Sequence, residues 1–183
     1  MAKHRLFDCA LYRGGIKTQG LIELCQYVKQ SYALENKRVI KIADVGCYAG
    51  ESTLIIQNIF QPGCSVVCID DWNPDNLKST GRNNLVEEMK HAQLNFNARI
   101  KGVKGISSVF RENAIAQSTL IKIPNQLFDF IHLDTVTDID LYKIHVESYL
   151  PKLKIGGFLA GSDYNLFENP DKIFSDGSWC KKF

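Results

Sequence analysis

The chain has 183 residues, of which 45% are hydrophobic and 23% charged, and its formal net charge is +2. These values are ordinary for one globular domain, so we expect a single domain over residues 1–183. The weak positive charge leaves no basic footprint for a nucleic acid partner. No apolar run approaches the ~20 residues of a membrane span, and the first residues lack the apolar core of a secretory signal.

Six cysteines stand at positions 9, 25, 47, 64, 68 and 180, without a Cys-x-x-Cys pair. A disulfide framework or a zinc site normally shows paired spacings. The cysteines therefore fit a reduced setting, and we expect a cytoplasmic protein.

Hydrophobic periodicity predicts strands and helices in alternation. An amphipathic helix over 18–35 lies in a helical N-terminal segment, 1–37. After it the pattern predicts strands over 39–45, 63–72, 99–104, 128–134 and 157–161, and helices over 51–60, 85–96, 107–120 and 138–153.

This alternation predicts an α/β fold with a mostly parallel sheet and helices on both faces. Only residues 164–183 remain after Asp163, and they include Asp176-Gly177, a turn signal. We therefore expect the C-terminal edge to be a short antiparallel hairpin or a single edge strand.

A glycine loop joins the first strand to the next helix. It reads Asp44-Val-Gly46-Cys47-Tyr48-Ala-Gly50, and the helix begins at about Glu51. Such a loop presents backbone N–H groups at the carboxyl edge of a parallel sheet, where open α/β folds bind nucleotide-like ligands. The spacing is not the Gly-x-Gly-x-x-Gly of a dinucleotide site. It suits a ligand with adenosine and an amino acid but no phosphate, such as S-adenosylmethionine.

Acidic residues end several of the predicted strands. Asp70 and Asp71 follow the second strand, where a carboxylate can accept both hydroxyl protons of a ribose. We expect Asp70 to do so, with Asp71 as its rival. Trp72 is expected equally to flank the adenine of the ligand or to pack against the edge of the sheet. Asp134 and Asp163 end two further strands.

The chain resembles the class I S-adenosylmethionine-dependent methyltransferases, and within them the small-molecule and sugar O-methyltransferases. The similarity covers about residues 39–164. The matching residues are Asp44, Gly46, Gly50, Ser52, Thr53, Ile69, Asp70, Trp72, Leu133, Asp134, Leu150-Pro-Lys-Leu-Lys154, Gly156, Gly157, Asp163 and Tyr164.

The resemblance implies a three-layer Rossmann-like methyltransferase sheet whose C-terminal antiparallel edge is shortened. It also implies a site for S-adenosylmethionine, with Asp44 shaping the loop and meeting the amino-acid end of the ligand. The expected cofactor-binding residues are Asp44, Gly46, Cys47, Tyr48, Gly50, Ser52, Thr53, Asp70, Asp71, Trp72 and Ser107.

The chain departs from the family where the chemistry is expected. The family's Asp-Gly-Asp-His reads Asp134-Thr-Val136-Thr137 here, and its Gly-Asp-Ser reads Gly105-Ile-Ser107. The base histidine is thus replaced by Thr137, which also fits a helix cap. Asp138 is a candidate substitute base, although an acid in a first helical turn also suits the helix dipole.

The resemblance makes Asp134 the first candidate for catalysis. A structural role, in which it caps a helix or braces a loop, is expected equally. It also makes Asp134 and Asp163 candidate ligands of Mg²⁺. His132 is expected to be a satisfied core histidine, and His145 to lie mid-helix, past the catalytic edge.

We therefore expect a methyltransferase that acts on a hydroxyl group of a small molecule or a sugar. The sequence does not decide whether it forms a homo-oligomer. The alternative is a non-catalytic S-adenosylmethionine-binding module that serves as a sensor or an assembly partner. A nicotinamide dehydrogenase is disfavoured by the glycine spacing.

Overall fold

The computed structural model describes residues 14–34, 39–73, 85–135, 139–162, 170–174 and 176–183. In this part of the chain a sheet of seven strands has the order β3-β2-β1-β4-β5-β7-β6. Its strands are β1 (Ile40–Val45), β2 (Cys64–Ile69), β3 (Ile106–Phe110), β4 (Phe128–Leu133), β5 (Leu153–Gly161), β6 (Lys172–Ile173) and β7 (Trp179–Lys182).

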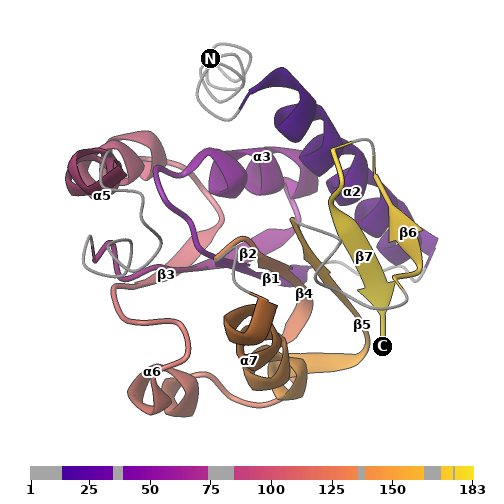
Figure 1. The fold of residues 1–183 in the computed structure, drawn as a ribbon. Helices are drawn as coiled ribbons and strands as arrows, with labels where there is room; N and C mark the ends of the chain where they lie inside the picture. The colour runs from indigo at the N-terminus through magenta and orange to yellow at the C-terminus, as the bar shows by residue number, and fades with distance from the viewer. Residues whose placement is uncertain (1–13, 35–38, 74–84, 136–138, 163–169, 175) are drawn as a thin grey trace.

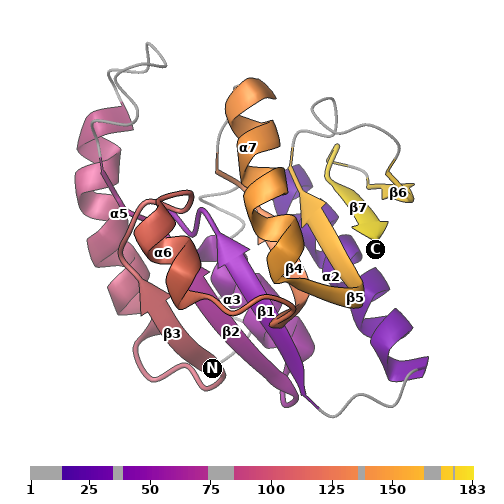
Figure 2. The same cartoon turned by 90° about the horizontal axis from the view of Figure 1, so that it is seen from below.

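Helices cover both faces of the sheet (Figure 1). One face carries α2 (Gly15–Leu34), α3 (Glu51–Phe60) and α5 (Leu85–Ile100), and the other carries α6 (Gln117–Lys122) and α7 (Ile139–Tyr149). Seen from below, α6 and α7 lie in front of the strands (Figure 2). The predicted three-layer α/β architecture is confirmed.

Successive residues of a strand belong to two separate hydrophobic cores, one on each face of the sheet, because side chains alternate between the faces. On β1, Ile42 belongs to the cluster under α2, α3 and α5, whereas Ala43 and Val45 belong to the cluster under α7. All six residues of β4 are buried. Burial on both faces is typical of parallel strands that lie between helix layers.

The C-terminal edge is antiparallel, as predicted. Strand β7 runs antiparallel to β5, and β6 pairs with the outer side of β7. The turn at Asp176-Gly177 connects β6 and β7, with Gly177 at a φ of 84°. Trp179 anchors this edge: it is fully buried, and its indole N–H donates to the hydroxyl of Tyr142 on α7 at 3.1 Å.

Two predicted elements were wrong. Residues 99–104 do not form the third strand, because α5 continues to Ile100 and a turn follows. The third strand is β3, so the helix predicted over 107–120 is also wrong, and only Gln117–Lys122 is helical there. In addition, α7 ends at Tyr149, and a 3-10 turn over Leu150–Lys152 leads into β5.

Candidate functional site

The carboxyl ends of the parallel strands are linked by backbone hydrogen bonds. The N–H of Gly46, just after β1, donates to Ile69 O at the end of β2 (2.9 Å). The N–H of Asp134, just after β4, donates to Val45 O (2.9 Å). Residues 46, 70 and 134, each the first after its strand, therefore lie along one edge of the sheet.

The loop between β1 and α3 requires glycine at both of its predicted positions. Gly46 has a φ of 85°, and a Cβ at this position would lie 2.2 Å from the carbonyl oxygen of Asp134. Gly50 has a φ of 91°, and a Cβ there would lie 3.1 Å from the ring of Phe96. Positive φ values and close approach both exclude larger residues. The loop thus packs backbone against the end of β4.

Cys47 points into the protein and not out of the loop. It is buried, and its Sγ lies 3.0 Å from Asp44 O as a hydrogen-bond donor. Burial, followed by the neighbouring thiol of Cys68 and the charge of Asp44, raises the pKa of Cys47 well above its ordinary value. A neutral buried thiol is a poor nucleophile. Cys47 can therefore contribute its backbone to a ligand site, but not reactive sulfur.

Asp70 connects the end of β2 to the glycine loop. Its Oδ2 accepts the backbone N–H of Tyr48 at 2.8 Å, and its Oδ1 accepts the backbone N–H of Trp72 at 2.8 Å. Burial raises the pKa of Asp70 to about 6, and the two backbone N–H donors work against that rise. Asp71 instead accepts the N–H of Asn73 in a local turn (3.1 Å). Asp70 is thus bonded directly to the backbone of the glycine loop.

Trp72 packs as a core residue at this edge. Only 5% of it is exposed, and its ring centroid lies 4.9 Å from that of Phe96 on α5. Its indole N–H donates to Tyr48 O at 2.6 Å, and the Arg111 guanidinium lies 5.5 Å from its ring centre. Tyr48 and Trp72 both have φ values in the left-handed region, at 46° and 47°. This turn is therefore held by specific contacts around Asp70.

Sequence reasoning missed the support that α5 gives to the loop. Arg99 donates from Nη1 to the carbonyl oxygen of Ala49 and to Glu51 Oε1, both at 2.6 Å. Glu51 is 5% exposed, so this ion pair is largely removed from water. Arg99 and Glu51 stand 48 positions apart, and no local sequence signal joins them.

Asp44 is enclosed by the protein. Its carboxylate is buried at the end of β1, where Oδ2 accepts the hydroxyls of Ser52 (2.8 Å) and Thr53 (2.5 Å). Its Oδ1 lies 2.9 Å from Nδ1 of His132. Asp44, Ser52 and Thr53 thus shape the loop from below. The expectation that His132 is a satisfied core histidine is confirmed.

His145 is buried within α7. Its Nδ1 contacts the carbonyl oxygen of Leu141 at 2.8 Å, one turn earlier in the helix. Burial lowers the pKa of His145. The predicted mid-helix position is confirmed.

Among the residues expected to take part in catalysis or to bind a metal, Asp134 is the one that lies in the described part of the chain. It is half-buried, and its Oδ1 accepts the hydroxyl of Ser162 after β5 (2.6 Å). Thr137, Asp138 and Asp163 lie outside the described residues. Within the described ranges, no three acidic, histidine or cysteine side chains gather into a metal site. The role of Mg²⁺ stays a prediction.

The reason for assigning Ser107 to the cofactor is wrong. The assignment assumed that Gly105-Ile-Ser107 follows the third strand, whereas Ser107 lies in the first half of β3. Its hydroxyl donates to Val66 O at 3.0 Å, near the middle of β2. Arg111 is the first residue after β3.

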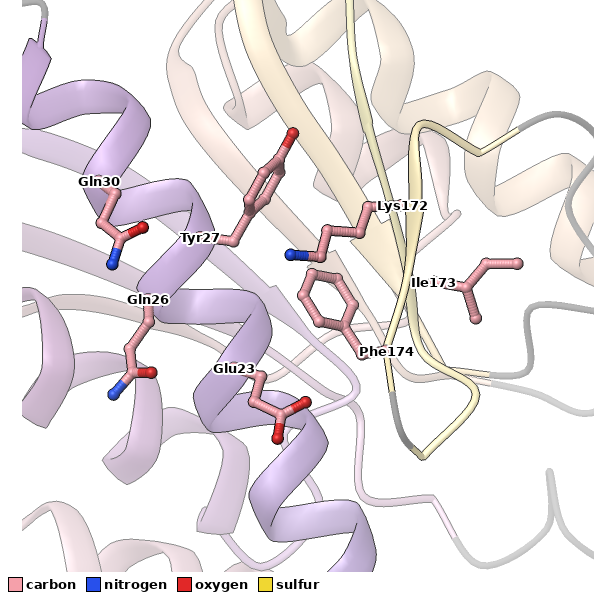
Figure 3. A pocket seen from close by; sticks show the side chains of 7 residues that line it. All are labelled: Glu23, Gln26, Tyr27, Gln30, Lys172, Ile173 and Phe174. Carbon is pink, nitrogen blue, oxygen red and sulfur yellow. The ribbon is translucent and has the colours of Figure 1, made fainter.

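A groove of about 330 Å³ lies elsewhere, between α2 and the edge strand β6. Figure 3 shows Lys172 directed toward Tyr27 and Phe174. Its Nζ lies 4.7 Å and 5.2 Å from the centres of those two rings. None of the residues expected to bind the cofactor lines this groove.

Proteins of known structure share this fold. The chain aligns with an S-adenosylhomocysteine-bound methyltransferase from Podospora anserina at a TM-score of 0.56, with 15% identity over 87% of this chain and 62% of that one. It aligns with a proposed caffeoyl-CoA O-methyltransferase from Staphylococcus aureus at a TM-score of 0.51, with 20% identity over 77% of this chain and 57% of that one. A proposed ribosomal RNA methylase from Clostridium thermocellum gives a TM-score of 0.52, with 12% identity over 79% of this chain and 69% of that one.

No protein-family model matches the sequence, and no curated protein matches it. The chain spans less than two thirds of the length of the Staphylococcus and Podospora proteins. At these identities the similarity shows the fold, which is the Rossmann-like fold of S-adenosylmethionine-dependent methyltransferases. None of the described helices is long and apolar enough to cross a membrane.

Proposed function

We propose that this chain binds S-adenosylmethionine at the carboxyl edge of β1, β2 and β4 and catalyses methyl transfer to a hydroxyl group of a small molecule or a sugar. The observation that carries the proposal is the pairing of Asp70 with the loop over residues 46–50. An acid at the end of the second strand, bonded to the loop after the first, can hold a nucleoside between them.

The residues at this edge suit the cofactor. Each Asp70 oxygen accepts one backbone N–H, and a carboxylate oxygen has two lone pairs, so both oxygens can also accept ribose hydroxyls. The first turn of α3 follows Gly50 directly, and helix N-termini favour anionic groups such as the ligand's carboxylate. When bound, S-adenosylmethionine supplies an electrophilic methyl group.

Asp134 is proposed as the group that receives the proton of the acceptor hydroxyl. Asp134 is the first residue after β4, its backbone carbonyl lies against Gly46, and the hydroxyl of Ser162 donates to one of its carboxylate oxygens. Positioning of the acceptor would supply much of the remaining rate. An Mg²⁺ ion shared with Asp163, and Asp138 as a substitute base, belong to this proposal.

A non-catalytic S-adenosylmethionine-binding module is the second candidate. It is favoured by the sequence at the family's base position, where Thr137 stands in place of histidine. General-base catalysis is commonly worth a factor of about 10²–10⁴, so its loss would reduce turnover while leaving binding intact.

Calorimetric titration with S-adenosylmethionine and S-adenosylhomocysteine tests the shared part of both candidates. We expect binding of both compounds, and absence of binding would reject both. Methyl transfer to a panel of sugars and phenols then separates them, because only the enzyme turns over.

A further inference from the structure

A polar network lies beneath the glycine loop, inside the core that α3 covers. It consists of Asp44 on β1, Ser52 and Thr53 in the first turn of α3, and His132 on β4. Their exposed fractions are 0%, 3%, 0% and 1%. Asp44 is the centre of this network, because the other three side chains all contact its carboxylate.

The network depends on the register of two parallel strands. Asp44 and His132 are direct partners in the pairing of β1 with β4. Both side chains lie on the face of the sheet that α3 covers, so the imidazole Nδ1–H can donate to Asp44 Oδ1 at 2.9 Å. A carboxylate removed from water requires such donors, because an unpaired buried charge is costly.

The same network joins the two parts of the proposed site. Ser52 and Thr53 follow the loop over 46–50 after one intervening residue, and His132 lies two residues before Asp134. Because Asp44 is fully buried and bonded on both oxygens, it has no exposed oxygen to offer a ligand. Its influence on a ligand would pass through the position of the loop.

We propose that His132 is a positioning residue: through Asp44 it fixes the first turn of α3, and with it the glycine loop, in the arrangement that binds the cofactor. The part of this inference that concerns the cofactor rests on the proposed function. The part that concerns the loop can be tested without a ligand.

The test uses two isosteric replacements of His132. Asparagine carries its amide nitrogen near the place of Nδ1 and can still donate to Asp44. Glutamine carries its amide nitrogen near the place of Nε2, away from Asp44. Phe130→Leu, on the same strand and equally buried, is the control for a general loss of core packing.

Two quantities are measured for each variant under conditions where it is folded. The first is amide hydrogen exchange at Gly46, Gly50 and Leu54, whose N–H groups donate to backbone carbonyls in or beside the loop. The second is affinity for S-adenosylhomocysteine. We expect His132→Gln to speed exchange at these amides by about tenfold and to weaken binding by about tenfold, while His132→Asn and Phe130→Leu stay close to wild type.

Wild-type loop exchange and affinity in His132→Gln would overturn the proposal, and so would equal effects of His132→Gln and Phe130→Leu. If the wild-type protein does not bind S-adenosylhomocysteine, the proposed function is what fails. The exchange comparison then still decides whether His132 holds the loop: faster exchange in the glutamine variant alone supports it, and equal exchange rejects it.

Discussion

The carboxylate of Asp70 accepts the backbone N–H of Tyr48 at 2.8 Å, and this bond links the end of β2 to the loop after β1. The two residues are 22 positions apart. In return, the carbonyl oxygen of Tyr48 accepts the indole N–H of Trp72, two residues beyond Asp70. The loop and the strand end therefore form one structural unit, and changes at Asp70 should affect both loop geometry and ligand binding.

Replacing Asp70 with alanine should weaken the binding of S-adenosylhomocysteine by about 1–3 kcal/mol, because hydrogen bonds to a charged group are lost. Asp71→Ala is the matched control, since Asp71 is the neighbouring acid and accepts the N–H of Asn73 in a local turn. Calorimetry on both variants checks the expectation. Unchanged affinity in Asp70→Ala would reject the ribose role.

The binding affinity should depend on pH through Asp70. Burial raises the pKa of Asp70 from 3.8 to about 6, and only the ionised carboxylate accepts both ribose hydroxyls. Affinity should be constant above about pH 7 and should fall below pH 6, by up to about tenfold per pH unit. Asp70→Asn should flatten this dependence. A flat profile in the wild-type protein would contradict the assignment.

The same raised pKa gives the opposite trend for stability without ligand. Between pH 4 and pH 6 the folded protein holds the Asp70 proton more tightly than the unfolded chain does. The stability that Asp70 contributes is therefore present below about pH 4 and is lost as the pH rises through about 6. Urea unfolding between pH 4 and pH 7 should therefore show that, as the pH rises, the free energy of unfolding of the wild type decreases relative to that of Asp70→Asn.

Alanine at Gly46 should destabilise the protein more than alanine at Gly102. Both glycines have positive φ, but a Cβ at Gly102 meets open space, whereas a Cβ at Gly46 would overlap Asp134 O. We expect about 1–2 kcal/mol for the backbone strain alone and about 1–3 kcal/mol more at Gly46 for the overlap. Urea unfolding measures both, and equal losses would show that the loop can move away from β4.

Asp134→Asn should lower kcat/KM for methyl transfer at least about tenfold, which corresponds to about 1.4 kcal/mol of barrier. Asp71→Asn, a similar change at the same edge, should have a smaller effect. EDTA should lower the activity as well if Asp134 shares Mg²⁺ with Asp163. Full activity in Asp134→Asn would remove its catalytic role, and resistance to EDTA would remove only the metal.

Restoring the family histidine provides a test by gain of function. Thr137→His should raise the turnover number by up to about 10²-fold without changing affinity for S-adenosylhomocysteine, because a general base adds to the rate and not to cofactor binding. If wild type already turns over rapidly and the histidine slows it, the base lies elsewhere, and Asp138 is the next residue to test. If neither protein turns over while both bind, the binding-module function is supported.

Most of the sheet could be predicted from the sequence because its inner strands are short, mostly apolar segments. Strand β4 is fully buried, β1 and β2 are largely buried, and the turn at Asp176-Gly177 identified the last hairpin. Strand β3 was missed because it is an edge strand whose Ser107 and Ser108 are exposed. Ile100 and Val103 look like a strand in sequence, but they pack from the end of α5 and the turn after it.

The site was predictable only where it is local. The glycines and the strand-end acids follow one another along the chain, so their spacing carries the signal. The contacts of Arg99 with the loop, of Phe96 with Trp72 and of His132 with Asp44 depend on how α5 and β4 lie against β1. A single sequence does not show which residue of β4 lies beside which residue of β1. It could therefore indicate that His132 is a core residue, but not that its partner is Asp44.

The hydrogen bond between Asp44 and His132 has an evolutionary consequence. Because both groups are buried, an apolar substitution at either position leaves the other with an unpaired polar atom, and a second substitution can restore the balance. Positions 44 and 132 should therefore change together among homologues, either as a polar pair or as an apolar pair. A lineage that replaced both with apolar residues should also have lost the constraint that keeps hydroxyl side chains at positions 52 and 53.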